Sequence, residues 1–128
     1  MWANPVPVVV ALIPLHHRDR IGLLTIRRGE PPSKGRIALV GGFLEAHESW
    51  QQGLSREVRE EVDLVIDPAT WTPFWYASSA PNPNRVLLFA TTHPIFQRSL
   101  PPFVANPEVS QRGIIFGPDG LSDIIAFP

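Results

Sequence analysis

The sequence contains no cysteine among its 128 residues, and it has little net charge. The absence of cysteine excludes disulfide bonds and thiolate metal sites. Charged residues make up only 18% of the chain and sum to a net charge of -1, so no overall basic field would attract nucleic acid. We therefore expect phosphate binding to be local and expect no nucleic-acid partner.

An apolar run of membrane-spanning length is also missing. The first segment, MWANPVPVVVALIPL, is interrupted by Pro5, Pro7 and Pro14, and no basic residue precedes it. A membrane helix needs about twenty apolar residues, and a signal peptide needs a basic front. We expect no membrane partner and a cytoplasmic location.

Hydrophobic residues make up 44% of the chain, which excludes a largely disordered protein. A chain of 128 residues has the length of one domain, and no repeat or linker divides it. We therefore expect a single domain over residues 1–128.

The hydrophobic pattern predicts several strands around one helix. Segments rich in β-branched, aliphatic or aromatic side chains predict strands over residues 6–15, 21–26, 37–40, 71–77, 85–92 and 113–116. Prolines predict irregular structure over 29–34 and 93–107. The helix is expected over 49–62, with Ser49 as its N-cap and Asp63 just past its end. This order favours a mixed sheet with the helix packed on one face.

Acidic side chains border the apolar stripe of this helix. At about 100° per residue, positions 50, 54 and 58 form the stripe, Glu57 and Glu61 flank it, and Glu60 lies about 80° away. Crowding three carboxylates in one sector is unfavourable unless a cation joins them, and carboxylate oxygens suit hard ions such as Mg²⁺. The alternative is a solvated, ion-paired helix surface, in which Arg56 pairs with Glu60.

The stretch GGFLEAHESWQQGLSREVREEVDL, at residues 41–64, resembles the Nudix box. The fixed positions of that box are matched by Gly42, Glu48, Arg56, Glu57, Val58, Glu60, Glu61 and Leu64. One position differs, because Asp63 stands where glycine is usual. Aspartate enters the left-handed conformation more readily than most residues, so we expect a strained helix cap. The alternative is that Asp63 adds a carboxylate near the metal.

The resemblance implies a fold of the α/β class, the Nudix-type α/β/α sandwich. In that fold a mixed β-sheet carries the catalytic helix on one face and a second helix, near the C-terminus, on the other. The sequence ends at Pro128, about where the second helix would begin, so that helix is expected to be missing or truncated. Either a loop or a partner chain, as in a homodimer, covers the second face, or the chain has been cut short.

The resemblance also implies a Mg²⁺-dependent pyrophosphohydrolase, with Mn²⁺ as the alternative ion. Its substrate would be a small molecule in which a nucleoside diphosphate is linked to another moiety, such as a nucleotide sugar, an ADP-ribose-like compound, a dinucleotide or a nucleoside triphosphate. The alternative is a catalytically weak or inactive Nudix-like module that binds a nucleotide as a sensor.

The residues of the box take particular roles by this resemblance. Glu57 would act as general base or bind the metal that holds the attacking water, and both roles stay open. Arg56 and Glu48 would form an ion pair that ties the loop to the helix. The expected metal ligands are Glu57, Glu60 and Glu61, joined by the backbone carbonyl of Gly41.

Other residues have weaker claims to the site. Arg27 and Arg28 could contact phosphate and are equally explained as a charged surface. His47 could also contact a phosphate or act as a base, but a single histidine in a turn is more often a solvated loop residue. Among the aromatic residues at positions 71 and 74–76, some are expected in the core and one could stack on a nucleobase. The loop SSAPNPNR is expected to line the substrate entrance.

Overall fold

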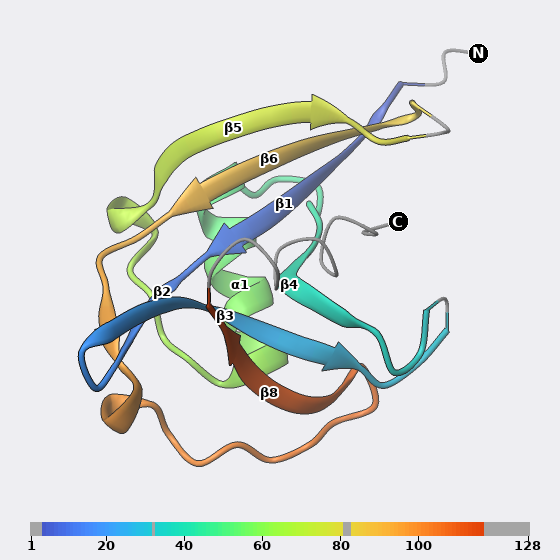
Figure 1. The fold of residues 1–128 in the computed structure, drawn as a ribbon. Coiled ribbons are helices and arrows are strands. Elements are labelled where there is room, and N and C mark those ends of the chain that lie inside the picture. The colour runs from blue at the N-terminus through green and yellow to red at the C-terminus, as the bar shows by residue number, and fades with distance from the viewer. Residues whose placement is uncertain (1–3, 32, 81–82, 117–128) are drawn as a thin grey trace.

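The computed structural model describes residues 4–31, 33–80 and 83–116, which form a twisted sheet with one α-helix against it (Figure 1). The helix α1 spans Trp50–Val62. The strands are β1 (Val6–Leu12), β2 (Pro14–His17), β3 (Arg20–Arg28), β4 (Ile37–Phe43), β5 (Thr72–Ser78), β6 (Arg85–Thr91), β7 (Ile95–Phe96) and β8 (Val109–Ile115). Two 3-10 helices, η1 (Pro68–Thr70) and η2 (Gln97–Ser99), complete the described elements.

The strands form one 8-stranded sheet within the part of the chain that the structure describes. Its order is β5-β6-β1-β4-β3-β2-β7, and β8 pairs with β3. Strand β1 runs parallel to β6 and antiparallel to β4, so the predicted mixed sheet is confirmed. In the β1–β4 register Val9 faces Gly42 and Val10 faces Gly41, which places the two glycines in the middle of the sheet.

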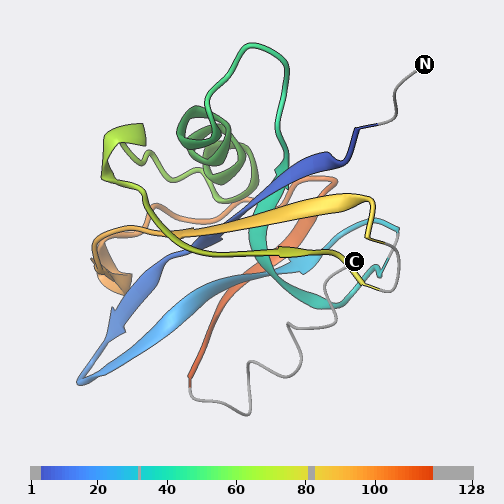
Figure 2. The same cartoon turned by 90° about the horizontal axis from the view of Figure 1, so that it is seen from above.

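The larger core lies between the sheet and α1, which covers one face (Figure 2). Val9 and Val40 from the sheet and Leu54 and Val58 from α1 are among its fully buried members. Each such side chain contributes about 1.5–3 kcal/mol when buried. This packing fixes the rotation of α1 about its axis, and therefore turns the acidic border of the helix toward β4.

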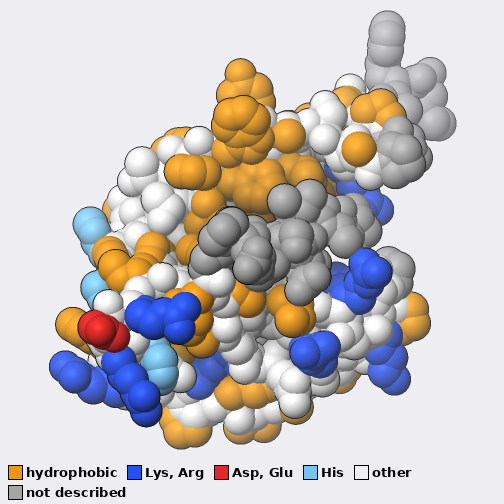
Figure 3. All heavy atoms as spheres, viewed as in Figure 1, with side chains coloured by type: hydrophobic (Ala, Val, Ile, Leu, Met, Phe, Trp, Pro, Cys, Tyr) orange, Lys and Arg blue, Asp and Glu red, His pale blue; other side chains and the backbone are white. Residues whose placement is uncertain are grey.

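The opposite face of the sheet is also apolar. Val8, Val10, Leu39 and Leu87 form a second buried cluster there. Figure 3, viewed from this face, shows hydrophobic side chains gathered over β5, β6 and β1. The second helix is expected to begin at about Pro128, and residues 117–128 lie outside the described residues.

Both ends of α1 follow the prediction. Ser49 forms a capping box: its side chain accepts from the Gln52 N–H, and the Gln52 side chain accepts from the Ser49 N–H. Asp63 ends the helix in the left-handed conformation, with φ 55° and ψ 37°, so it is the strained cap that the sequence predicts. None of the described helices is long and apolar enough to cross a membrane.

Several boundaries differ from the predictions, three of them for a reason that the pairing or the prolines supply. The strand expected over 6–15 is divided at Ile13, where the chain turns from pairing with β4 to pairing with β3. The 93–107 segment contains β7 and η2, because its prolines exclude only a central strand and β7 is a two-residue edge strand. The last strand begins at Val109, earlier than residue 113, because pairing with β3 extends it.

Candidate functional site

The C-terminal half of α1 places two buried carboxylates against the backbone of β4. Glu57 is 9% exposed and Glu61 is 5% exposed. The Gly41 N–H donates to Glu61 Oε1 at 3.1 Å. A Cβ at position 42 would lie 2.5 Å from the Glu57 carboxyl carbon, a distance that real Cβ atoms do not show. Gly42 is therefore required for Glu57 to reach its place beside the strand.

The electrostatics of this pair reflect its burial. Burial raises the pKa of Glu57, although the nearby Arg56 guanidinium opposes the rise. Burial, with the Glu57 charge second, raises the pKa of Glu61 to about 9. Both shifts mean that negative charge is poorly compensated at this place. A positive charge brought between the helix and β4 would stabilise the ionised forms.

Arg56 connects the helix to the loop that precedes it. Its Nε donates to Glu48 Oε2 at 3.0 Å, and its Nη2 donates to Glu48 Oε1 at 2.7 Å and to the Phe43 carbonyl at 3.0 Å. The expected ion pair is therefore present. The guanidinium lowers the pKa of Glu48, and hydrogen bonding to that carboxylate raises the pKa of Arg56.

Gly53 makes room for this ion pair and was missed by sequence reasoning. A Cβ at position 53 would lie 2.7 Å from Glu48 Oε1 and 2.3 Å from the Leu44 side chain. Glycine inside a helix is unfavourable by about 1 kcal/mol relative to alanine. A glycine in the middle of a predicted helix is thus a usable signal of close packing.

The other side of the Arg56 guanidinium joins Glu57 and Glu60. Its Nη1 lies 2.9 Å from Glu57 Oε1 and 3.3 Å from Glu60 Oε2. The Glu60 side chain is half exposed, at 50%, unlike the buried pair. The pairing of Arg56 with Glu60 that the surface interpretation requires is therefore also present.

The structure brings Glu57 and Glu61 together but holds Glu60 against Arg56. Across residues 4–31, 33–80 and 83–116, no three histidine or carboxylate side chains are grouped so that they could hold a metal ion. The chemistry of the donors nevertheless fits a hard divalent cation, because two carboxylates are buried side by side and Arg56 pairs only with Glu57 of the two. Rotation of the Glu60 side chain away from Arg56 would supply the third.

A further carboxylate near the site, Glu108, was not expected from the sequence. Its negative charge contributes to the raised pKa of both Glu57 and Glu61. Asn106 holds this turn: its Oδ1 accepts from the Glu108 N–H at 3.0 Å, and its Nδ2 donates to the Glu61 carbonyl at 3.4 Å. Glu108 is far from α1 in the sequence and reaches the end of that helix only because β8 pairs antiparallel with β3. The residues around it therefore contain no pattern that would link it to the site.

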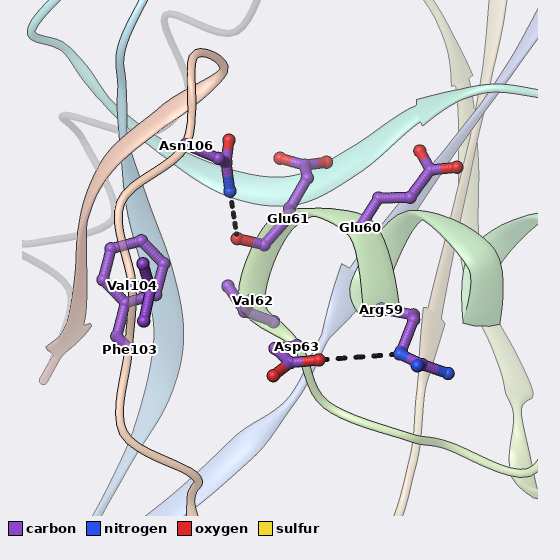
Figure 4. Close-up of a pocket in the computed structure, with 8 residues that line it drawn as sticks. All are labelled: Arg59, Glu60, Glu61, Val62, Asp63, Phe103, Val104 and Asn106. Atoms are coloured by element: carbon purple, nitrogen blue, oxygen red, sulfur yellow. Dashed lines mark hydrogen bonds and ion pairs between the residues drawn. The ribbon is translucent and has the colours of Figure 1, made fainter.

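A hollow of about 190 Å³ lies at the C-terminal end of α1, between the helix and the 103–106 segment. Figure 4 shows that the carboxylates of Glu60 and Glu61 point away from Asp63. Asp63 instead pairs with Arg59, with Oδ1 and Nε 3.5 Å apart. Asp63 is therefore a helix cap. The alternative, in which Asp63 adds a carboxylate beside Glu60 and Glu61, is wrong.

The weaker candidates lie in different environments. Trp71 is a core residue, 5% exposed, and its Nε1 donates to Ser55 Oγ at 2.8 Å. Phe74, Trp75 and Tyr76 are exposed on the edge strand β5. Arg27 is bonded to Gln111 of β8 and to the Gly35 carbonyl, so it braces the loop after β3.

Solved structures with the same arrangement are numerous. The NUDIX domain of Shewanella oneidensis NrtR, solved with ADP ribose, has a TM-score of 0.77 and 20% identity, covering 98% of this chain and 82% of that one. A MutT NUDIX hydrolase from Burkholderia pseudomallei has a TM-score of 0.68 and 21% identity, over 94% of this chain and 87% of that one. These likenesses confirm the Nudix fold, of which the described residues supply the sheet and one helical layer.

Sequence comparison gives the same assignment. An ADP-ribose pyrophosphatase from Methanocaldococcus jannaschii is 42% identical over 43 residues, which is 34% of this chain and a quarter (25%) of that protein's length. The family model of the NUDIX domain matches residues 5–113, which is most of the chain. The chain therefore belongs to the Nudix family.

Proposed function

We propose that this chain is a metal-dependent pyrophosphohydrolase acting on a nucleoside diphosphate linked to another moiety. The observation that supports it best is the pair of buried carboxylates, Glu57 and Glu61, seated against Gly41 and Gly42. A hydrolase of phosphoric anhydrides needs such concentrated negative charge to bind a divalent cation. Family membership and the short match to an ADP-ribose pyrophosphatase support the same reaction.

The proposed ligands are Glu57, Glu60, Glu61 and the Gly41 carbonyl, and Glu108 adds negative charge to their surroundings. Bound Mg²⁺ or Mn²⁺ would neutralise phosphate charge and activate a water. A relative from Francisella tularensis, a bifunctional NMN adenylyltransferase/ADP ribose pyrophosphatase, was solved with AMP and a Mn ion, at a TM-score of 0.68 and 22% identity, over 97% of this chain and 37% of that one.

The protein's own residues would hold this site in shape. Arg56 fixes the loop through Glu48 and the Phe43 carbonyl, and Gly42 lets the β4 backbone approach Glu57. Glu57 would either bind the metal that holds the attacking water or take a proton from that water. Among substrates we favour ADP-ribose-like compounds, with nucleotide sugars, dinucleotides and nucleoside triphosphates as the remaining members of the class.

The test is hydrolysis of ADP-ribose, a dinucleotide, a nucleotide sugar and a nucleoside triphosphate with Mg²⁺ or Mn²⁺, followed by product detection. Glu57→Gln and Glu61→Gln should each lower kcat at least 100-fold while circular dichroism stays unchanged. Asp19→Asn, at an exposed turn between β2 and β3, is the control and should keep full activity. Undiminished turnover in both glutamine variants would refute the assignment.

A nucleotide-binding module without catalysis is the second candidate. It is favoured by the position of Arg56, whose guanidinium pairs with both Glu57 and Glu60, two of the expected metal ligands. Among the described residues, the expected ligands are therefore not grouped so that they could hold a metal ion. Calorimetry with ADP-ribose and Mg²⁺ separates the two candidates. Stable binding with no product after hours identifies a module, whereas product formation identifies an enzyme.

A further inference from the structure

A second hollow, of about 220 Å³, lies between β8 and the segment that precedes it. It is lined by residues of β2, β3, β8 and the 97–103 segment, and polar atoms supply more of its exposed surface than apolar atoms. Its polar side chains are Gln97 and Arg112. Phe103 lines both this hollow and the one at the end of α1, but none of the site carboxylates lines the second. We name it the Arg112 pocket.

Arg112 is half-buried on the face of the sheet that α1 covers. In the β3–β8 register it stands opposite Ile26, which belongs to the core under α1, and opposed residues share a face of the sheet. The guanidinium carbon lies 5.6 Å from the centroid of the Phe103 ring. Among the other side chains that line the pocket, only Gln97 carries an acceptor, and it makes no hydrogen bond to Arg112 Nη1.

One atom of this guanidinium is left unsatisfied. Arg112 Nη1 is buried and has no hydrogen-bond partner, and no other buried side-chain nitrogen or oxygen is in this condition within the residues described. Burial also lowers the pKa of Arg112, which is the mark of a desolvated cation. A buried charged donor without an acceptor is unfavourable and uncommon in folded proteins. A bound acceptor would remove this defect.

We propose that the Arg112 pocket binds a small organic carboxylate with an apolar body. The carboxylate would accept a hydrogen bond from Arg112 Nη1, and the apolar body would contact Leu100 and Phe103, which are partly exposed in the pocket. The size is suitable, because a cavity of about 150 Å³ holds benzene. A phosphate dianion fits less well, since a single guanidinium leaves its second charge and other oxygens unpaired. The proposal does not depend on hydrolysis at the carboxylate site.

The test uses benzoate, its neutral counterpart benzamide, and inorganic phosphate. Each is titrated into the protein, with and without Mg²⁺, and followed by ¹⁵N–¹H NMR. We expect benzoate to shift the amides of Phe103, Gly113 and Ile114 and to bind at least tenfold more tightly than benzamide or phosphate, which is the effect of one charge-assisted hydrogen bond. Equal affinity for benzoate and benzamide, or shifts centred on residues 57–61, would overturn the proposal.

Variants give a second, independent comparison. Arg112→Met should abolish the preference for benzoate over benzamide, and its melting temperature should be equal or higher because an unpaired donor is removed. Arg85→Met is the matched control, because Arg85 also stacks on a phenylalanine, 5.0 Å from the Phe43 ring, but does not line the pocket. An unchanged preference in Arg112→Met refutes the site. The wild-type titrations decide the matter even if that variant is unstable.

Discussion

The ion pair between Arg56 and Glu48 should be among the strongest polar interactions in this domain. Its two hydrogen bonds measure 2.7 and 3.0 Å, and the side chains are only 22% and 14% exposed. Hydrogen bonds to charged groups contribute about 1.5–3 kcal/mol each, whereas exposed pairs contribute about 0.2–1 kcal/mol. Since the pair shares one guanidinium with other acceptors, we expect a coupling free energy of about 2–3 kcal/mol.

A double-mutant cycle measures this coupling. Arg56→Met, Glu48→Gln and the double variant are unfolded with urea at pH 7 without divalent cations, and the coupling is taken from the free energies of unfolding. Loss of the Glu57 and Glu60 contacts occurs in both variants that lack Arg56, so it cancels. The control cycle uses Arg59 and Asp63, which pair at 3.5 Å on the same helix but are 65% and 72% exposed.

The control coupling should stay below about 0.5 kcal/mol, as for other exposed helix pairs. If the Arg56–Glu48 coupling is no larger than the control, the loop before α1 is not held by this ion pair. The orientation of the helix would then depend on apolar packing alone.

Three other changes test neighbouring features. Gly42→Ala should displace the Glu57 carboxyl, because the new Cβ would lie 2.5 Å from its carbon, and kcat should fall at least tenfold. Gly113→Ala is the control: its nearest atom would be 3.3 Å from the new Cβ, and kcat should not fall. Glu61→Gln should stabilise the metal-free protein, and the gain in unfolding free energy should increase as pH rises from about 4.5 to about 9. Over that range Glu61 has lost its proton in the unfolded wild-type chain but keeps it in the folded protein, so the wild type becomes less stable. Urea denaturation of both proteins at several pH values measures this difference. At the left-handed cap, Asp63→Gly should be more stable than Asp63→Ala by about 1 kcal/mol in urea, and equal stability would contradict the strained-cap assignment.

The helix and the buried carboxylate pair were predictable because their determinants are local. Ser49 and Asp63 mark the two ends of α1 by their own chemistry, and helical spacing places Glu57 and Glu61 beside the apolar stripe. Gly42 also follows from the sequence, since a fixed spacing links it to Glu57. The interpretation of this helix as an ordinary solvated surface fails for the buried pair but describes Glu60 correctly.

The remaining parts of the site depend on distant segments and on side-chain rotamers. Glu108 and Asn106 reach α1 only because β8 pairs with β3. The position of Arg56 between Glu57 and Glu60 is a choice among rotamers, which spacing does not determine. Similarly, hydrophobicity alone does not separate Trp71, which is buried, from Tyr76, which is exposed on an edge strand.

The pairing of β3 with β8 has a consequence for the order of folding. Arg27 and Gln111, which meet across these strands, are 84 residues apart, whereas Gly41 and Glu61 are separated by only 20. Short loops close at lower entropic expense and usually sooner, so the helix and β4 can assemble before the last strand arrives. A nascent chain would then hold Glu57 and Glu61 against β4 while still lacking Glu108.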